Sequence, residues 1–118
     1  MVGRARRATK AEKIHMDKVA KLPCLCCGLK GVEQPSITTV HHLLTGGKRR
    51  GHRYVLNLCE WHHYARPIVV QASSIVGHTE KWMTHQYGPS LVMGSKTFHE
   101  YWGSDQELLD KLECLLVS

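Results

Sequence analysis

The apolar residues near the C-terminus are spaced as they are on one face of an α-helix. Five leucines follow one another at offsets 0, 1, 4, 7 and 8, directly after Ser104 and Glu107, which have the spacing of a capping box. The pattern predicts an amphipathic helix that docks through its leucine face. Cys114 on the same helix is expected to be a core residue. The leucines are Leu108, Leu109, Leu112, Leu115 and Leu116.

The rest of the chain predicts a mixture of helix and strand. Thr9 and Glu12 form another capping box, which opens a helix that runs to about Lys21 and is stopped by Pro23. A β-branched stretch at 37–44 and a second predicted strand at 54–58 indicate an antiparallel hairpin with a wide, basic tip. A short helix is expected from about residue 59 to 66. The pattern over 68–87 fits neither helix nor strand clearly.

The composition narrows the class of protein. Of 118 residues, 42% are hydrophobic and 22% are charged, which fits a folded domain with a core of moderate size. No run approaches the roughly 18 uncharged apolar residues that a membrane-spanning helix needs. Residues 1–9 are rich in arginine without an apolar run, so they do not resemble a secretory signal. We therefore expect a cytoplasmic protein.

Positive charge is concentrated in two places. The formal net charge is +6, and seven of the sixteen Lys and Arg residues fall within residues 1–23, with four more within residues 48–53. A basic arm and a basic loop are typical of contacts to the DNA phosphate backbone. The alternative is a solvated tail that keeps the protein soluble. The predicted DNA-binding residues are Arg4, Arg6, Arg7, Lys48, Arg49 and Arg50.

Cysteine spacing indicates a metal site. Five cysteines without an export signal argue against a disulfide framework. Cys24 and Cys27 form a C-x-x-C pair, and Cys59 and His62 form a C-x-x-H pair about 30 residues later. The two half-sites predict a tetrahedral Cys₃His site for a structural zinc ion. Cys26 could replace Cys24 or Cys27, and buried thiols without a metal are the alternative.

Three further histidines point to chemistry beyond a structural ion. His41 and His42 are neighbours on a predicted strand, so their side chains leave opposite faces. His63 follows His62 and points about 100° away from it on a helix. The zinc ion would bring His63 against the first strand, so the sequence predicts a second, open metal site beside an imidazole. In the alternative, His41 and His42 only form hydrogen bonds or contact phosphates.

This order of motifs resembles the ββα-metal (HNH) nuclease motif. The resemblance implies an α+β fold, with a small zinc-stapled HNH-like core between an N-terminal helix and a C-terminal amphipathic helix. It also implies that His41 and His63 hold a catalytic divalent ion, Mg²⁺ or another, and that His42 is the general base. The HNH asparagine falls at Tyr54, and Asn57 is out of phase with that position, so we do not assign Asn57 a catalytic role. The remaining catalytic candidates are His52, which could orient the base, and Arg53, which could hold the scissile phosphate.

A narrower likeness covers most of residues 10–117. The chain resembles the phage Ref-type, RecA-dependent nucleases, which implies DNA and the host RecA filament as partners. The expected organisation is a basic disordered arm at residues 1–8 and a single zinc-containing nuclease domain at 9–118. The likeness is carried by residues 12–24, Val40 to Leu44, Gly46 to Arg50, Leu58 to His63, Gly88 to Leu91, Gly94 to Lys96, Phe98 and Gly103 to Leu109.

Two functions follow from these observations. The first is a metal-dependent DNA endonuclease, a phosphodiester hydrolase that acts in RecA-dependent phage or prophage recombination. The alternative is a non-catalytic zinc-finger protein that binds nucleic acid as a recombination accessory factor. The number of metal sites separates them, because the enzyme needs a structural zinc ion and a second, exchangeable ion.

Overall fold

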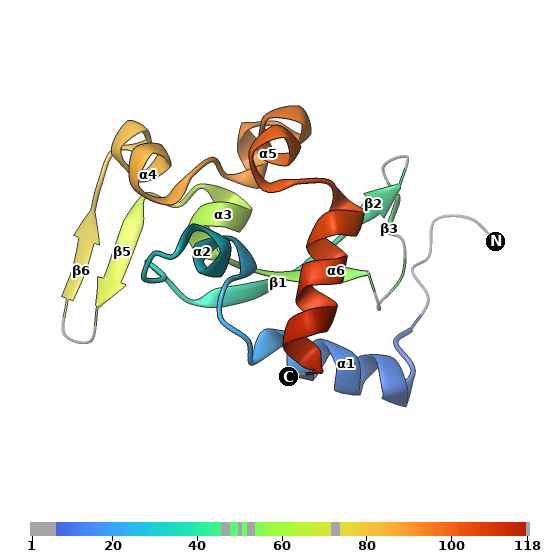
Figure 1. Ribbon diagram of the computed structural model, residues 1–118. Helices are drawn as coiled ribbons and strands as arrows, with labels where there is room; N and C mark the ends of the chain where they lie inside the picture. The colour runs from blue at the N-terminus through green and yellow to red at the C-terminus, as the bar shows by residue number, and fades with distance from the viewer. Residues whose placement is uncertain (1–6, 46–47, 50, 52–53, 72–73, 118) are drawn as a thin grey trace.

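A two-stranded antiparallel sheet lies at the centre of the computed structural model (Figure 1), which describes residues 7–45, 48–49, 51, 54–71 and 74–117. In this sheet Thr38 pairs with Cys59 and His42 pairs with Val55. The described elements, in chain order, are α1 (Lys10–Ala20), α2 (Leu25–Lys30), β1 (Thr38–His42), β2 (Leu44–Thr45), β3 (Lys48–Arg49), β4 (Val55–Cys59), α3 (Glu60–Tyr64), β5 (Ile68–Gln71), β6 (Ser74–Gly77), α4 (Glu80–Tyr87), the 3₁₀ turn η1 (Leu91–Met93), α5 (Ser95–Trp102) and α6 (Asp105–Leu116).

The predicted hairpin is confirmed and is longer than β1 and β4 alone. The pairing continues through β2 and β3, where Leu44 lies opposite Arg49. All five residues of β4 are buried, whereas all five residues of β1 are half-buried. β4 is therefore the core strand, and β1, which carries His41 and His42, is the more accessible strand of the pair.

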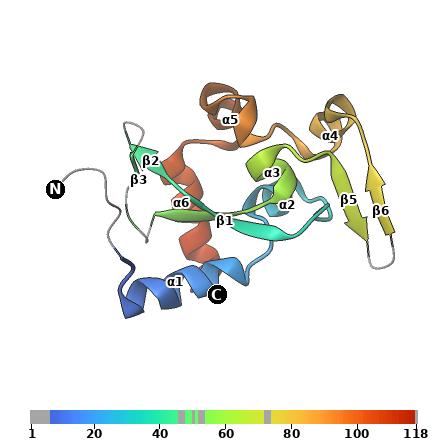
Figure 2. The ribbon, with the colours of Figure 1, turned by 180° about the vertical axis from the view of Figure 1, so that it is seen from behind.

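Helices cover the central sheet and protect β4. The helix α6 crosses the β1–β4 pair in front in Figure 1 and lies behind it in Figure 2, and it contacts β4. α1 lies below the two strands in Figure 1 and contacts both of them. The short helices α2 and α3 lie above the strands in this view and contact β4. The core between these elements is apolar, with Leu56, Trp61, Phe98, Leu108 and Leu112 among its fully or almost fully buried members.

Both predicted capping boxes are present. The Thr9 hydroxyl accepts from the Glu12 amide while the Glu12 carboxylate accepts from the Thr9 amide, and Ser104 and Glu107 repeat this arrangement at the start of α6. In α1 only Glu12 and Val19 are buried, so this helix lies over the body of the protein. Local hydrogen bonding therefore sets where both terminal helices begin.

Part of the leucine-face prediction for α6 is wrong. Leu108 and Leu112 are buried, and Leu109 and Leu116 pack partly against the core, but Leu115 is 46% exposed. Cys114 is exposed and does not belong to the core. Cys114 follows the buried Leu112 by two positions, which places it about 200° around the helix axis. The docking face is therefore narrower than the sequence pattern indicates.

The region 68–87 resolves into a β-hairpin and a helix. β5 and β6 pair antiparallel, with Val69 opposite Val76, and together with α4 they form one end of the molecule in Figure 1. The preceding helix α3 ends at Tyr64, earlier than predicted, because Ala65 adopts a left-handed conformation with φ 56°. No helix among the described residues has the length and apolar character that crossing a membrane requires.

A candidate metal centre and a pair of facing histidines

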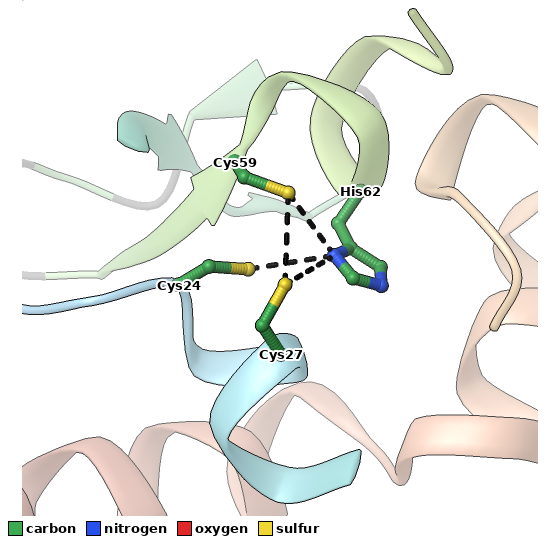
Figure 3. A group of neighbouring side chains, drawn as sticks. All are labelled: Cys24, Cys27, Cys59 and His62. Atoms are coloured by element: carbon green, nitrogen blue, oxygen red, sulfur yellow. Dashed lines mark hydrogen bonds between the residues drawn. The ribbon is translucent and has the colours of Figure 1, made fainter. Parts of the chain in front are cut away.

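Four buried side chains from separate parts of the chain meet at the end of β4. Cys24 and Cys27 come from the start of α2, Cys59 ends β4, and His62 projects from α3 (Figure 3). Their ligand atoms all lie within 4.8 Å of one another. The structure thus assembles the four residues that the two half-motifs predict.

The spacing of these atoms matches a tetrahedral zinc site. The Sγ atoms of Cys24, Cys27 and Cys59 lie 3.4, 3.5 and 3.3 Å from His62 Nδ1, and the Sγ atoms of Cys27 and Cys59 are 3.9 Å apart. Zinc–sulfur bonds of about 2.3 Å and a zinc–nitrogen bond of about 2.0 Å would separate the ligand atoms by about 3.5 to 3.8 Å. The buried Cys₃His cluster fits a structural zinc ion.

The closely spaced cysteines alter one another's pKa values. Hydrogen bonds from Cys27 and Cys59 lower the pKa of the Cys24 thiol, so Cys24 readily becomes a thiolate, the form that binds zinc. Burial, followed by the negative charges of Cys24 and Cys59, raises the pKa of the Cys26 thiol. The pKa of the Cys27 thiol is raised as well, by its interactions with Cys24 and Cys59 and by burial, so it is the geometry that excludes Cys26: it is not part of the four-residue cluster.

The backbone around Tyr87 fixes the orientation of the zinc-site histidine. His62 Nε2 lies 2.7 Å from the Tyr87 carbonyl oxygen. A carbonyl oxygen can only accept, so His62 Nε2 carries the proton and Nδ1 presents its lone pair to the three sulfurs. The Trp61 and Trp102 indoles donate to the carbonyls of Gly88 and Pro89, which holds this turn in place.

Glycine is required in that turn. Gly88 has φ 84°, and a Cβ atom there would lie 2.6 Å from the Trp102 ring. A side chain would therefore both strain the backbone and displace the tryptophan that holds the turn. The carbonyl group that orients His62 depends on this close approach.

Two contacts hold the chain on either side of the first cysteine. The Cys24 amide donates to Gln34 Oε1 over 2.6 Å. Asn57 is fully buried on β4, and its Nδ2 donates to the Pro23 carbonyl. Asn57 thus connects β4 to the segment that carries Cys24 and Cys27, which is a structural role.

The second predicted group is formed in part. His41 on β1 and His63 on α3 face one another, with ring centroids 4.9 Å apart and planes inclined by 69°. His63 also stacks on Tyr64, at 3.9 Å between centroids, and its Nδ1 lies 2.7 Å from the Thr39 hydroxyl oxygen. The strand and the helix therefore bring two imidazoles together, as the sequence indicates.

Both facing histidines are neutral at physiological pH. Burial is the main reason that the pKa of His41 falls from 6.5 to about 4, and the positive charges of His63, His42 and His99 lower it further. Burial also lowers the pKa of His63. Neutral imidazoles have a lone pair for a metal ion, so the chemistry of the pair fits a divalent cation.

The other predicted site residues do not belong to the His41–His63 pair. His42 is the last residue of β1 and is half-buried, and strand alternation directs its side chain away from the face of His41. Arg7 is exposed ahead of α1, and Lys48 and Arg49 form β3 at the hairpin tip. Arg4, Arg6, Arg50, His52 and Arg53 lie outside the described residues.

Sequence reasoning missed three groups that position these histidines and cysteines. Thr39 could have been found, because residues two apart on a strand share a face and Thr39 precedes His41 by two. The Gln34 side chain and the Tyr87 carbonyl carried no signal. Backbone carbonyls in particular act independently of residue type.

The geometry defines a small α+β protein with a zinc-type Cys₃His cluster and two adjacent neutral imidazoles. A family model described as recombination enhancement, RecA-dependent nuclease matches residues 8–117. The chain belongs to this family. The family description indicates a nuclease that takes part in recombination and depends on RecA, which supports DNA and RecA as partners.

Proposed function

We propose that this protein is an HNH-type endodeoxyribonuclease of the phage Ref type, which hydrolyses phosphodiester bonds in DNA engaged by a RecA filament. The observation that carries the proposal is the approach of His63 to His41 across the β1–α3 contact, next to the Cys₃His cluster. The family description supports nuclease activity and RecA dependence. The HNH type and the phage relationship rest on the order of the sequence motifs.

His41 and His63 would hold the catalytic ion, for which Mg²⁺ or another divalent cation is suitable. When bound, such an ion polarises a phosphate oxygen and offsets the negative charge that builds up during hydrolysis. The Cys₃His cluster has a different task. Its ligands are buried and come from α2, β4 and α3, so a zinc ion there would fix the helix that carries His63 against the strand that carries His41.

The remaining catalytic roles are assigned to His42, Arg53 and His52. His42, in its neutral form, would accept a proton from the attacking water as it adds to phosphorus. Arg53 would bind the scissile phosphate and His52 would orient the base, roles that rest on the sequence alone. Lys48 and Arg49 at the hairpin tip, together with Arg50, which follows them in the sequence, would contact the DNA backbone.

Cleavage assays with and without RecA test the proposal. Zinc-loaded protein is incubated with single- and double-stranded DNA and Mg²⁺, in the presence and absence of an active RecA filament. We expect cut products only when both Mg²⁺ and the filament are present. DNA binding without cleavage under every condition, together with a single bound zinc ion per chain, would instead support the non-catalytic zinc-finger alternative.

The N-terminal arm should contribute to DNA affinity through charge. Deletion of residues 1–8 should weaken binding and reduce the slope of log affinity against log salt by about 3, because Arg4, Arg6 and Arg7 would each displace about one counterion. Fluorescence anisotropy over a salt series measures this slope. Replacement of the three arginines by alanine keeps the arm's length and should give the same result. An unchanged slope would identify the arm as a solvated tail.

A further inference from the structure

The neighbouring histidines of α3 are hydrogen-bonded through opposite ring nitrogens. His62 uses Nε2 to contact the Tyr87 carbonyl, whereas His63 uses Nδ1 to contact the Thr39 hydroxyl. The two rings leave one short helix in different directions, His62 toward the cysteines and His63 toward β1. The Tyr87 carbonyl can only accept, which places the His62 proton on Nε2. The Thr39 hydroxyl can donate or accept, so its other hydrogen-bond partner decides the tautomer of His63.

The Thr39 hydroxyl has two close neighbours but only one proton. Its Oγ1 lies 2.8 Å from the Leu58 carbonyl oxygen and 2.7 Å from His63 Nδ1. The carbonyl oxygen can only accept, so the hydroxyl proton is directed to Leu58. The Thr39 oxygen must then accept from His63, which places a proton on Nδ1 and the lone pair of the neutral ring on Nε2.

We propose that Thr39 is a positioning residue that holds His63 in the Nδ1–H tautomer and thereby makes Nε2 its metal-binding atom. The proposal deepens the proposed function, since it rests on His63 as a ligand of the catalytic ion. Adjacent histidines then have opposite tautomers. His62 presents Nδ1 to the buried Cys₃His cluster, and His63 presents Nε2 to the proposed catalytic-ion site that it shares with His41. Each ring can therefore serve only one of the two metal sites.

Three contacts keep the His63 ring from turning over. Tyr64 stacks on its face with planes only 17° apart, and the His41 ring also contacts it, with the two planes inclined by 69°. A ring flip would also break the hydrogen bond to Thr39. Thr39 and His41 are two residues apart on β1 and share a face of the strand, so a single strand supplies both the acceptor and the facing imidazole.

Nuclear magnetic resonance of the zinc-loaded protein without a second metal ion tests the tautomers directly. Two-bond ¹H–¹⁵N spectra distinguish a protonated ring nitrogen from one with a lone pair, and His63→Ala assigns the His63 signals. We expect the lone pair on Nε2 for His63 and a proton on Nε2 for His62. A protonated His63 Nε2 in the wild type would overturn the proposal.

Two substitutions at Thr39 separate the hydroxyl from the shape of the side chain. Thr39→Val keeps the β-branched shape but has no oxygen, so His63 should move toward the Nε2–H form that a free imidazole prefers. Thr39→Ser keeps the hydroxyl and should retain the wild-type tautomer. If Thr39→Val left the His63 signals unchanged, Thr39 would not be the group that sets the tautomer.

Metal binding provides a second, independent measurement. Mn²⁺ is a suitable probe because, among the first-row divalent transition metals, it generally binds a given protein site most weakly. It should therefore not displace the zinc ion from the Cys₃His cluster. Calorimetry should show Mn²⁺ binding about 10–100-fold weaker in Thr39→Val, the usual cost of losing a group that orients a ligand, and near wild-type binding in Thr39→Ser. Zinc content should be the same in all variants. If the tautomer is as proposed but His63→Ala leaves Mn²⁺ affinity unchanged, the tautomer assignment stands and the catalytic-ion site of the proposed function is wrong.

Discussion

Cys59→Ser should lose its zinc ion and unfold at growth temperature. Cys59 is fully buried, and its Sγ lies within 3.9 Å of Cys27 Sγ and 3.3 Å of His62 Nδ1, so no water can take its place without rearrangement. Structural zinc contributes on the order of 10 kcal/mol or more in zinc-finger peptides, which is comparable with the whole stability of about 5–15 kcal/mol of a typical domain. Zinc content by mass spectrometry and thermal unfolding by circular dichroism measure the outcome.

Two other cysteines serve as controls for this experiment. Cys26→Ala removes a buried thiol beside the cluster without removing a ligand, so it should keep the zinc ion and cost only about 1 kcal/mol for the lost packing. Cys114→Ser changes an exposed thiol and should leave both measurements unchanged. A Cys59→Ser protein with normal zinc content and melting temperature would show that the ligand assignment is wrong.

The parts of the fold that local chemistry determines were accessible from the sequence. A tetrahedral Cys₃His site requires short spacings between paired ligands, and the C-x-x-C and C-x-x-H segments meet that requirement. The two capping boxes combine a hydroxyl and a carboxylate three residues apart, and both form. The β1–β4 hairpin follows from a β-branched segment and a largely apolar segment on either side of a glycine-containing loop.

Elements that depend on distant packing were harder to predict. The β5–β6 hairpin has apolar residues on both strands but no Asn-Gly or Asp-Gly turn between them, so its sequence resembles a buried helix as much as a hairpin. On α6, the apolar residues spread over a wider face than the core covers, so Leu115 and Cys114 are exposed although Leu116 packs partly against the core. The extent of a docking face depends on what the helix meets, and the sequence of the helix does not contain that information.

In the candidate site, too, some features follow from the local sequence and others depend on distant parts of the fold. The convergence of His41 and His63 follows from strand and helix geometry once the zinc ligands are in place. The groups that orient the rings come from elsewhere. The Tyr87 carbonyl belongs to a turn held by two tryptophans, and the Thr39 hydroxyl acts because Leu58 lies opposite it in the sheet. Ligands could be identified from residue type, whereas their supporting contacts required the three-dimensional structure.

His42→Ala should reduce DNA cleavage by about 10²–10⁴-fold while the protein retains its fold, its zinc ion and its affinity for the second metal. Loss of a general base typically has an effect of this size, and an ordered water can replace part of the function. The substitution removes no member of the Cys₃His cluster and neither of the facing imidazoles. Single-turnover cleavage at saturating Mg²⁺ measures the rate. His85→Ala, which removes an exposed imidazole from α4, is the matched control and should cleave normally.

His63→Ala should differ from His42→Ala in how it responds to metal concentration. Removing one of two ligands weakens binding of the catalytic ion, so excess Mg²⁺ should restore part of the activity, whereas no Mg²⁺ concentration replaces a missing base. The zinc ion should be unaffected, because His62 and not His63 presents its Nδ1 to the cysteines. Cleavage rates against Mg²⁺ concentration therefore separate a ligand, which shifts the midpoint of the curve, from a base, which lowers its plateau. If His42→Ala cuts at the wild-type rate, the base assignment is wrong, and His41 or His52 becomes the next residue to test.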